Sequence, residues 1–341
     1  MLEFLNISHS YNNQKILNDF SMKLESGKVV SLLGPSGCGK TTLLKLASGI
    51  EKLQNGEIKL NNEIVSSPNI HLNSEKRNVG YVFQDCALFP HLTILQNIFF
   101  GMKSIEIEKQ KNKIQSLMKE INISSLSEKY PHELSGGQQQ QVALVRAMAS
   151  DPKIIFLDEP YSNLDSRLKE KIRDQMLHIL REHNISALLV THDPEEAMFM
   201  SDKIGILNNG SIEQFGSPID LYLRPKSAFI AEFFGEINVF EGIVDDGTIN
   251  TVLGTFKCSN KFNKKNAESA ANYLLECGIS KAVVLHSPQH TIWKDKNKIS
   301  HWFKPKLLKP NCLAFLALKP ILFIFGVLKP SLKPKFLQTQ F

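Results

Sequence analysis

The glycine-rich segment GPSGCGKTT at residues 34–42 constrains the fold of this chain more than any other feature, because it fits the pattern GxxxxGK[ST]. An apolar run, Val29–Leu33, precedes it and a helical pattern over residues 40–48 follows, which is the context that the pattern requires. Glycines permit backbone angles that point several N–H groups inward, and a helix N-terminus adds partial positive charge. The segment therefore predicts a strand–loop–helix unit that binds the phosphates of a nucleoside triphosphate; an ordinary glycine-rich turn is the alternative.

Two side chains of this segment have predicted roles of their own. Lys40 is expected to reach the β- and γ-phosphates, and the hydroxyl of Thr41 is expected to ligate Mg²⁺. The remaining candidate nucleotide-binding residues of the loop are Gly34, Pro35, Ser36, Gly37, Cys38, Gly39 and Thr42.

A second candidate site follows about 120 residues later, in KIIFLDEP at 153–160. An apolar strand there ends in two carboxylates, and successive strand residues point to different sides. Asp158 can then join the Mg²⁺ shell, since Mg²⁺ prefers oxygen ligands, while Glu159 faces the attacking water. A plain strand end is the alternative reading.

Further apolar runs predict strands at Val79–Phe83, Ile154–Leu157 and Ala187–Thr191. Helical patterns lie at about 106–121, 138–149, 166–182 and 194–200. Strands that alternate with helices predict an α/β fold with a mainly parallel sheet.

Composition narrows the possible partners. The chain of 341 residues has a net charge of +6, but residues 301–341 hold seven Lys and no Asp, Glu or Arg, which leaves −1 on residues 1–300. There is thus no broad basic face, and nucleic acid is not an expected partner. Five Cys without a CxxC pair favour reduced thiols, and the N-terminus shows no signal peptide. No apolar run in residues 1–300 reaches the roughly 20 residues that span a bilayer, so a membrane role requires another subunit.

The segment LSGGQQQQ at 134–141 makes the chain resemble the ABC ATPase family over about residues 1–240. The resemblance implies a P-loop NTPase cassette with a helical subdomain. Ser135, Gly136 and Gly137 open a helix and offer a second anion site. In that family two subunits face each other head to tail, and each ATP lies between the cradle of one and the LSGG segment of the other. The resemblance therefore implies ATP and Mg²⁺ as ligands and a second copy of the chain as partner.

Other landmarks of the family occur in order. Tyr11 matches the aromatic residue that stacks on adenine, and Gln84 matches the glutamine that contacts Mg²⁺ and water. Asp165 closes the SNLD loop that crosses the dimer interface, and His192 matches the histidine that holds the γ-phosphate. Gln141 departs from the family, which often has Arg there, and is expected to tune activity.

The stretches 75–101 and 191–207 resemble ATPase subunits that energise the uptake of ferric iron, polyamines, sulfate or sugars. The resemblance implies transmembrane permease subunits as partners, an indirect link to a solute-binding protein, and a peripheral location at the cytoplasmic face of the plasma membrane. Ferric iron is the expected cargo, with polyamine, sulfate or sugar as alternatives. A soluble ABC ATPase, an exporter ATPase and a binding-only pseudoenzyme are disfavoured, the last by intact Lys40, Asp158, Glu159 and His192.

The expected domains are a cassette over 1–235, a small β-rich, OB-like accessory domain over 236–300 that matches its family only in part, and an atypical Lys-Pro-rich tail over 301–341. Within the accessory domain, strands are expected at Glu241–Val244 and Thr248–Phe256, joined by an Asp246-Gly247 turn. Lys-Pro occurs five times in the tail, which breaks any long helix. A basic appendage near lipid, an altered C-terminus and an interrupted membrane span remain alternatives for the tail.

Overall fold

The computed structural model describes residues 1–102, 104–162, 164–245, 248–251, 254–257, 282–286, 291–295, 300–303, 314–317 and 321–327. The chain divides into two compact units, Met1–Arg224 and Pro225–Phe341. Across these described ranges, no helix has both the length and the apolar character needed to cross a bilayer.

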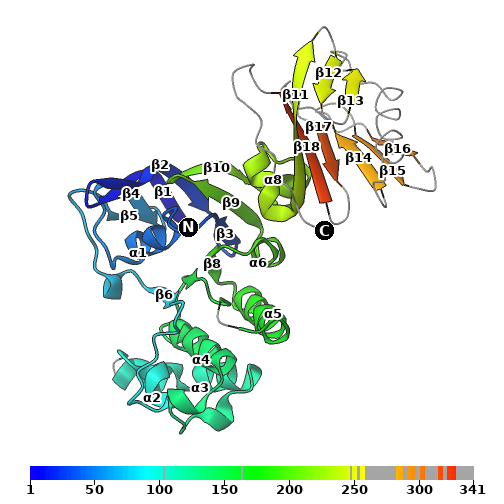
Figure 1. Ribbon diagram of the computed structural model, residues 1–341. Coiled ribbons are helices and arrows are strands. Elements are labelled where there is room, and N and C mark those ends of the chain that lie inside the picture. Colours follow the sequence, from blue (N-terminus) through cyan, green and yellow to red (C-terminus); the bar gives the residue numbers. More distant parts are fainter. Residues whose placement is uncertain are drawn as a thin grey trace. The chain divides into compact units, whose positions relative to one another are not determined.

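A six-stranded sheet forms the centre of the first unit (Figure 1). All neighbouring strands are parallel except β10, which runs antiparallel to β9. In spatial order the strands are β10 (Ser211–Gly216), β9 (Lys203–Asn208), β3 (Val29–Leu33), β8 (Ser186–Thr191), β7 (Ile154–Asp158) and β6 (Val79–Val82). Every residue of β3, β7 and β8 is buried, which explains why these strands read as continuous apolar runs. The expected α/β class is confirmed.

The register of this sheet places the candidate site residues at the carboxyl ends of its central strands. Leu33 of β3 is paired with Thr191 of β8, and Asp158 of β7 is paired with Val190 of β8. Because these strands are parallel and end at nearly the same level, the segments that follow them leave the sheet side by side. The glycine-rich loop, the acidic pair and the candidate histidine all belong to those segments.

A separate four-stranded antiparallel sheet packs over the first helix. Its strands in order are β2 (Gln14–Leu24), β1 (Leu2–Tyr11), β4 (Asn55–Leu60) and β5 (Glu63–Ser66). Phe4 and Phe20 meet edge to face in its core, with ring centroids 5.4 Å apart. The sequence pattern does not predict these strands, because irregular positions such as Asn6 and Asp19, with φ of 52° and 50°, interrupt their alternation.

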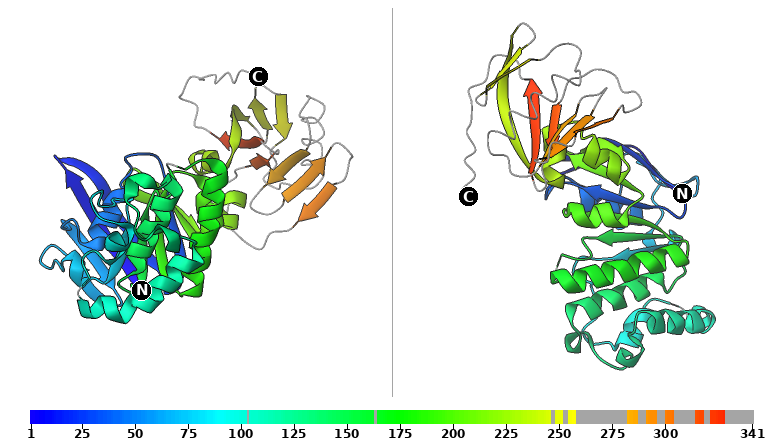
Figure 2. Two further views of the ribbon diagram at one scale, coloured as in Figure 1. Left: turned by 90° about the horizontal axis from the view of Figure 1, so that it is seen from below. Right: turned by 90° about the vertical axis from the view of Figure 1, so that its right-hand side faces the viewer.

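Helices pack around the two sheets of the first unit. They are α1 (Lys40–Ser48), α2 (Ile94–Phe99), α3 (Ser104–Glu120), α4 (Gly136–Met148), α5 (Ser166–Glu182), α6 (Pro194–Met200) and α7 (Pro218–Leu223), with 3₁₀ turns at Ser74–Lys76, Ser124–Leu126 and Pro131–Glu133. Figure 1 and the right-hand view of Figure 2 show α2, α3 and α4 gathered at the end of the unit away from β1 and β2, which is the expected helical subdomain. The helices predicted from the pattern correspond to α1 and α3–α6.

The second unit contains α8 (Ala228–Phe234) and an eight-stranded sheet. In spatial order the strands are β13 (Gly254–Lys257), β12 (Thr248–Thr251), β11 (Glu236–Asp245), β18 (Ile321–Val327), β17 (Ala314–Ala317), β14 (Ala282–His286), β15 (Thr291–Asp295) and β16 (Ser300–Phe303). The single strand expected over Thr248–Phe256 is wrong: the structure has two antiparallel strands there, β12 and β13. The Asp246-Gly247 turn lies outside the described residues.

The segment expected to form a separate tail contributes strands to this same sheet. β18 pairs in parallel with β11, from Glu236 with Ile321 to Gly242 with Val327. The apolar run at 321–327 therefore forms a strand, and residues 236–245 and 321–327 share one layer. The domain boundaries at 235 and 300 stay predictions.

Candidate functional site: a nucleotide-phosphate cradle

The glycine-rich loop leaves β3 and turns directly into α1. Gly37 and Gly39 have φ of 80° and 102°, a region that side chains disfavour. A Cβ on Gly39 would stand 2.6 Å from Leu17 Cδ2, and a Cβ on Gly34 would stand 2.4 Å from the Leu207 carbonyl oxygen. The tip, Pro35–Gly37, is exposed beside a cavity of about 220 Å³. Gly34 and Gly39 thus allow the loop to pack closely on the protein, and Gly37, where a Cβ would meet nothing within 4 Å, lies at its open tip.

Lys40 is folded back over this loop. Its ammonium donates to the carbonyl oxygens of Gly34 and Pro35, at 2.9 Å each, and the residue is only 5% exposed. The Cys38 sulfur lies 3.8 Å from the same nitrogen, and burial raises the pKa of that thiol. The thiol therefore stays neutral and adds no negative charge to the cradle. A buried cation whose near partners are two carbonyl oxygens and a neutral thiol fits a site for phosphate oxygens.

The cradle and the acidic strand end are joined by a hydrogen bond. Thr41 Oγ1, in the first turn of α1, donates to Asp158 Oδ1 at 2.8 Å, and the Tyr81 hydroxyl donates to Asp158 Oδ2 at 3.1 Å. Burial raises the pKa of Asp158, while these two hydrogen bonds act to lower it. A hydroxyl and a carboxylate oxygen side by side, beside a triphosphate cradle, are a donor set that fits Mg²⁺.

Glu159 follows the last residue of β7 and has a left-handed backbone, with φ of 44°. Its amide donates to the Val190 carbonyl at 2.9 Å, which ties this bend to β8. Its Oε2 lies 3.0 Å from Nδ1 of His192, the residue that follows β8. The structure thus brings together the two candidate residues expected to act on the water and the γ-phosphate.

Gln84 reaches the same loop through an intermediate. Its Nε2 makes a long hydrogen bond of 3.5 Å to Ser162 Oγ, and Ser162 Oγ donates to the Glu159 carbonyl at 3.1 Å. Gln84 is therefore connected to the Glu159 backbone through the Ser162 hydroxyl.

A network behind the histidine holds the start of α6. Lys169 of α5 pairs with Asp193 and, at 2.7 Å, with Glu196, which is 3% exposed. Thr191 donates to the other oxygen of Glu196. Burial alone would raise the pKa of Asp193, but the hydrogen bond and charge of Lys169, together with the backbone amides of Glu195 and Glu196, hold this pKa below its usual range. Because His192 lies between Thr191 and Asp193, the network fixes the backbone on both sides of it.

The LSGG segment lies on α4. Ser135 caps the helix and forms a capping box with Gln138. Gly136 is exposed, whereas a Cβ on Gly137 would stand 2.6 Å from Ile172 Cδ1 of α5. Among the described residues, no hydrogen bond connects Ser135, Gly136 or Gly137 to the cradle.

Asp165 caps α5 by accepting a hydrogen bond from the Leu168 amide at 3.0 Å. Its neighbour Asn163 lies outside the described residues. Gln141, the departure from the family pattern, donates to the Ile121 carbonyl at 3.2 Å and to Gln175 at 2.9 Å. It joins α4 to α5 and to the end of α3 and has no hydrogen bond to the cradle in the described part of the chain.

Tyr11 ends β1 and is 37% exposed. Its hydroxyl donates to Glu51, which is also 3.2 Å from Nε2 of the buried His9. Burial and the Glu51 carboxylate raise the pKa of Tyr11 to about 12, while contact with Thr42 of the cradle acts to lower it. The ring is thus held next to the first turn of α1.

Tyr81, Glu51 and Lys169 hold candidate residues of this site in place but are not among the sequence-based candidates. A phenol within the apolar strand β6 is a signal that points to Tyr81, since a buried Tyr hydroxyl needs a partner. Glu51 and Lys169 lie in polar stretches of the sequence, and no local pattern distinguishes them from ordinary surface residues.

Comparison with known proteins agrees with this geometry. The profile of the ABC transporter family matches residues 17–162. An Fe(3+) ions import ATP-binding protein, FbpC 2 of Haemophilus influenzae, is 40% identical over 269 residues, which cover 78% of this chain and 76% of that protein. The spermidine/putrescine import ATP-binding protein PotA of the same species is 41% identical over 246 residues, covering 72% and 65%. The sulfate/thiosulfate import ATP-binding protein CysA of Neisseria meningitidis is 39% identical over 248 residues, covering 71% and 68%.

Solved structures give the same result. A dimeric ATP-binding cassette with bound ADP and Pi is 29% identical, with a TM-score of 0.55 and coverage of 64% of this chain and 99% of that chain. CbiO1 of Clostridium perfringens, part of the ABC transporter complex CbiONQ, is 26% identical, with a TM-score of 0.59 and coverage of 65% and 90%. This chain therefore belongs to the ABC transporter family, as one of its ATP-hydrolysing subunits.

Proposed function

We propose that this chain powers an import system as a head-to-tail pair with a second copy, and that the cargo of the system is ferric iron. The observation that carries the catalytic part is the Thr41–Asp158 hydrogen bond, which joins the phosphate cradle to the acidic strand end. It brings a phosphate-binding loop and a Mg²⁺ donor set to one edge of the sheet.

In this proposal the loop amides of residues 34–42 and the Lys40 ammonium bind the phosphates of ATP. Thr41, Asp158 and Gln84 hold Mg²⁺, which neutralises charge on the phosphates when bound. Glu159 orients the attacking water, and His192 holds the γ-phosphate. Tyr11 stacks on the adenine.

The second copy completes each site. Ser135, Gly136 and Gly137 form a helix N-terminus suited to the phosphates of the ATP bound by the partner. Asp165 lies in the loop that crosses between the copies. The dimeric cassette among the solved relatives supports this arrangement. The pair docks at the cytoplasmic face of the plasma membrane on permease subunits, which receive cargo from a solute-binding protein.

The ferric iron proposal depends on how far the similarity extends. Fe(3+) ions import proteins of Haemophilus influenzae and Pectobacterium atrosepticum align over 269 and 255 residues, against 246 and 248 for the polyamine and sulfate relatives. The Fe(3+) ions import protein of Photobacterium profundum aligns over 247 residues, as the other two classes do. Identity is nearly equal in the three cases, so the cargo needs a direct test.

The test uses the chain reconstituted in liposomes with a candidate permease. Solute-binding proteins loaded with ferric iron, spermidine or sulfate are added separately, and ATP hydrolysis is measured. We expect stimulation by the ferric form alone, and none in a Lys40→Ala control. Stimulation by the spermidine-loaded or sulfate-loaded protein instead would reject iron and leave the ATPase assignment intact.

A further inference from the structure

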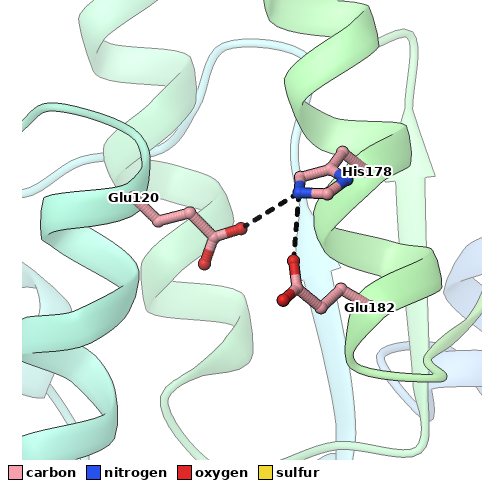
Figure 3. A group of neighbouring side chains, drawn as sticks. All are labelled: Glu120, His178 and Glu182. Atoms are coloured by element: carbon pink, nitrogen blue, oxygen red, sulfur yellow. Dashed lines mark ion pairs between the residues drawn. The ribbon is translucent and has the colours of Figure 1, made fainter.

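Three side chains able to bind a metal meet on the surface where α3 ends beside α5. Glu120 is the last residue of α3, and His178 and Glu182 lie one turn apart on the same face of α5 (Figure 3). His178 Nε2 lies 3.0 Å from Glu182 Oε2 and 4.0 Å from Glu120 Oε1. One ligand atom from each residue lies within 4.8 Å of the other two.

A fourth group faces the same carboxylate. His183, which ends α5, has its Nε2 shielded from solvent and without a hydrogen-bond partner, 3.9 Å from Glu120 Oε2. An imidazole nitrogen shielded in this way costs free energy unless a ligand or proton acceptor satisfies it. Glu120 thus has one imidazole near each of its oxygens.

The charge of the cluster favours a cation. In the described part of the chain, Glu120 and Glu182 form ion pairs with His178 and His183 and with no Lys or Arg. With neutral imidazoles the three side chains that meet carry two negative charges and offer one nitrogen and two oxygen ligands, and His183 places a second imidazole nitrogen beside Glu120. That mixture suits Zn²⁺ and related transition metals, whereas Mg²⁺ and Ca²⁺ prefer oxygen alone.

The geometry needs only a small adjustment. Ligands at about 2.0–2.2 Å from a tetrahedral Zn²⁺ stand roughly 3.3–3.6 Å from one another. The His178–Glu182 pair is already close to that spacing, and Glu120, which lies within 4.8 Å of both, needs to approach by at most about 1.5 Å. His178 and Glu182 are largely exposed, so their side chains are free to rotate.

We propose that Glu120, His178 and Glu182, assisted by His183, form a binding site for a zinc-like divalent transition metal. The site is independent of the nucleotide site and of the proposed cargo. A bound ion would link the end of the helical subdomain to α5, the helix whose first turn is capped by Asp165. The competing reading is a set of surface ion pairs with protonated histidine and no metal.

The experiment measures Zn²⁺ binding by titration calorimetry and the shift in Tm, using the full chain freed of metal and kept reduced. We expect the His178→Ala variant to bind one Zn²⁺ per chain fewer than the parent chain. The Tm of the parent chain should rise with Zn²⁺ but not with Mg²⁺ at the same concentration. Glu182→Gln, which keeps the shape of the side chain, should weaken Zn²⁺ binding by more than the roughly 10–100-fold typical of outer partners. His132→Ala removes an exposed imidazole elsewhere and should bind as the parent does.

Co²⁺ provides a readout that the cysteines of the chain cannot imitate, because thiolate ligands add intense charge-transfer bands. The proposal requires that the Co²⁺-loaded parent chain has a Co²⁺ spectrum that lacks those bands. This spectrum should disappear in His178→Ala. Equal Zn²⁺ stoichiometry in the parent chain, His178→Ala and Glu182→Gln would overturn it. So would the absence of any Tm shift with Zn²⁺ in the parent chain.

Discussion

The imidazole of His192 and the carboxylate of Glu159 form a hydrogen bond, with 3.0 Å between Nδ1 and Oε2. The two residues follow neighbouring parallel strands, β8 and β7, and are 33 positions apart in the sequence. The contact joins the residue proposed to orient the water to the residue proposed to hold the γ-phosphate, so each restrains the position of the other.

Replacing Glu159 by Gln is expected to stop turnover while keeping the binding of ATP. The amide preserves the shape of the side chain and its hydrogen bond, but it cannot accept the proton of the attacking water. We expect kcat to fall roughly 100–10,000-fold and the Kd for ATP to change little. Single-turnover hydrolysis and nucleotide binding check this, and an unaltered kcat would remove Glu159 from the mechanism.

Replacing Lys40 by Ala is expected to weaken ATP binding. The variant loses a charge-assisted contact with phosphate, which corresponds to roughly a 10–100-fold increase in Kd. Lys52→Ala, which removes an exposed cation outside the loop, serves as the matched control. Equilibrium binding of a fluorescent ATP analogue measures both, and equal affinities in the two variants would count against the cradle.

Replacing Glu51 by Ala is expected to raise the KM for ATP, because the ring of Tyr11 is then held less firmly in position. Loss of the Tyr11–Glu51 hydrogen bond should cost about 2–10-fold in KM with little change in kcat. Tyr11→Phe, which keeps the ring, should reproduce this effect, and Tyr11→Ala should exceed it. Steady-state kinetics distinguish these cases; a Glu51→Ala enzyme with parental KM would show that the contact does not orient the ring.

Replacing Lys169 by Met is expected to destabilise the fold in a pH-dependent way. The folded-state pKa of Asp193 is held below its unfolded value, so its pairing with Lys169 stabilises the fold above the unfolded pKa and is lost as the pH falls through the folded one. The variant should lose roughly 2 kcal/mol at neutral pH, and less in acid.

Thermal unfolding at several pH values measures this loss, with Lys171→Met on the exposed face of α5 as control. A difference between Lys169→Met and the parent chain that does not shrink in acid would contradict the role given to Asp193.

The parts of the site that the sequence predicts are those with a local signal. Gly37 and Gly39 adopt positive φ, which favours glycine, so the spacing of the glycines predicts the loop. The fully buried strands β3, β7 and β8 are predicted by their apolar runs. The contact between Thr41 and Asp158 follows from the parallel order of those strands.

The parts that the sequence did not predict depend on distant contacts. The Tyr11–Glu51 and Lys169–Glu196 pairs join segments whose proximity is set by packing, and no local pattern marks Glu51 or Lys169. The split of the Thr248–Phe256 strand into β12 and β13 likewise follows from their antiparallel pairing.

The most direct test of the shared site is the mass of the Glu159→Gln chain in solution with Mg-ATP, measured by sedimentation. We predict a doubling of mass with ATP and a monomer with ADP. Gly136→Asp, added to that chain, places a carboxylate where the partner's phosphates bind and should keep it monomeric although its own cradle still binds ATP; Gly136→Ala should leave the doubling intact. A chain that stays monomeric with Mg-ATP, or that doubles equally with Gly136→Asp, would contradict a site completed by the second copy.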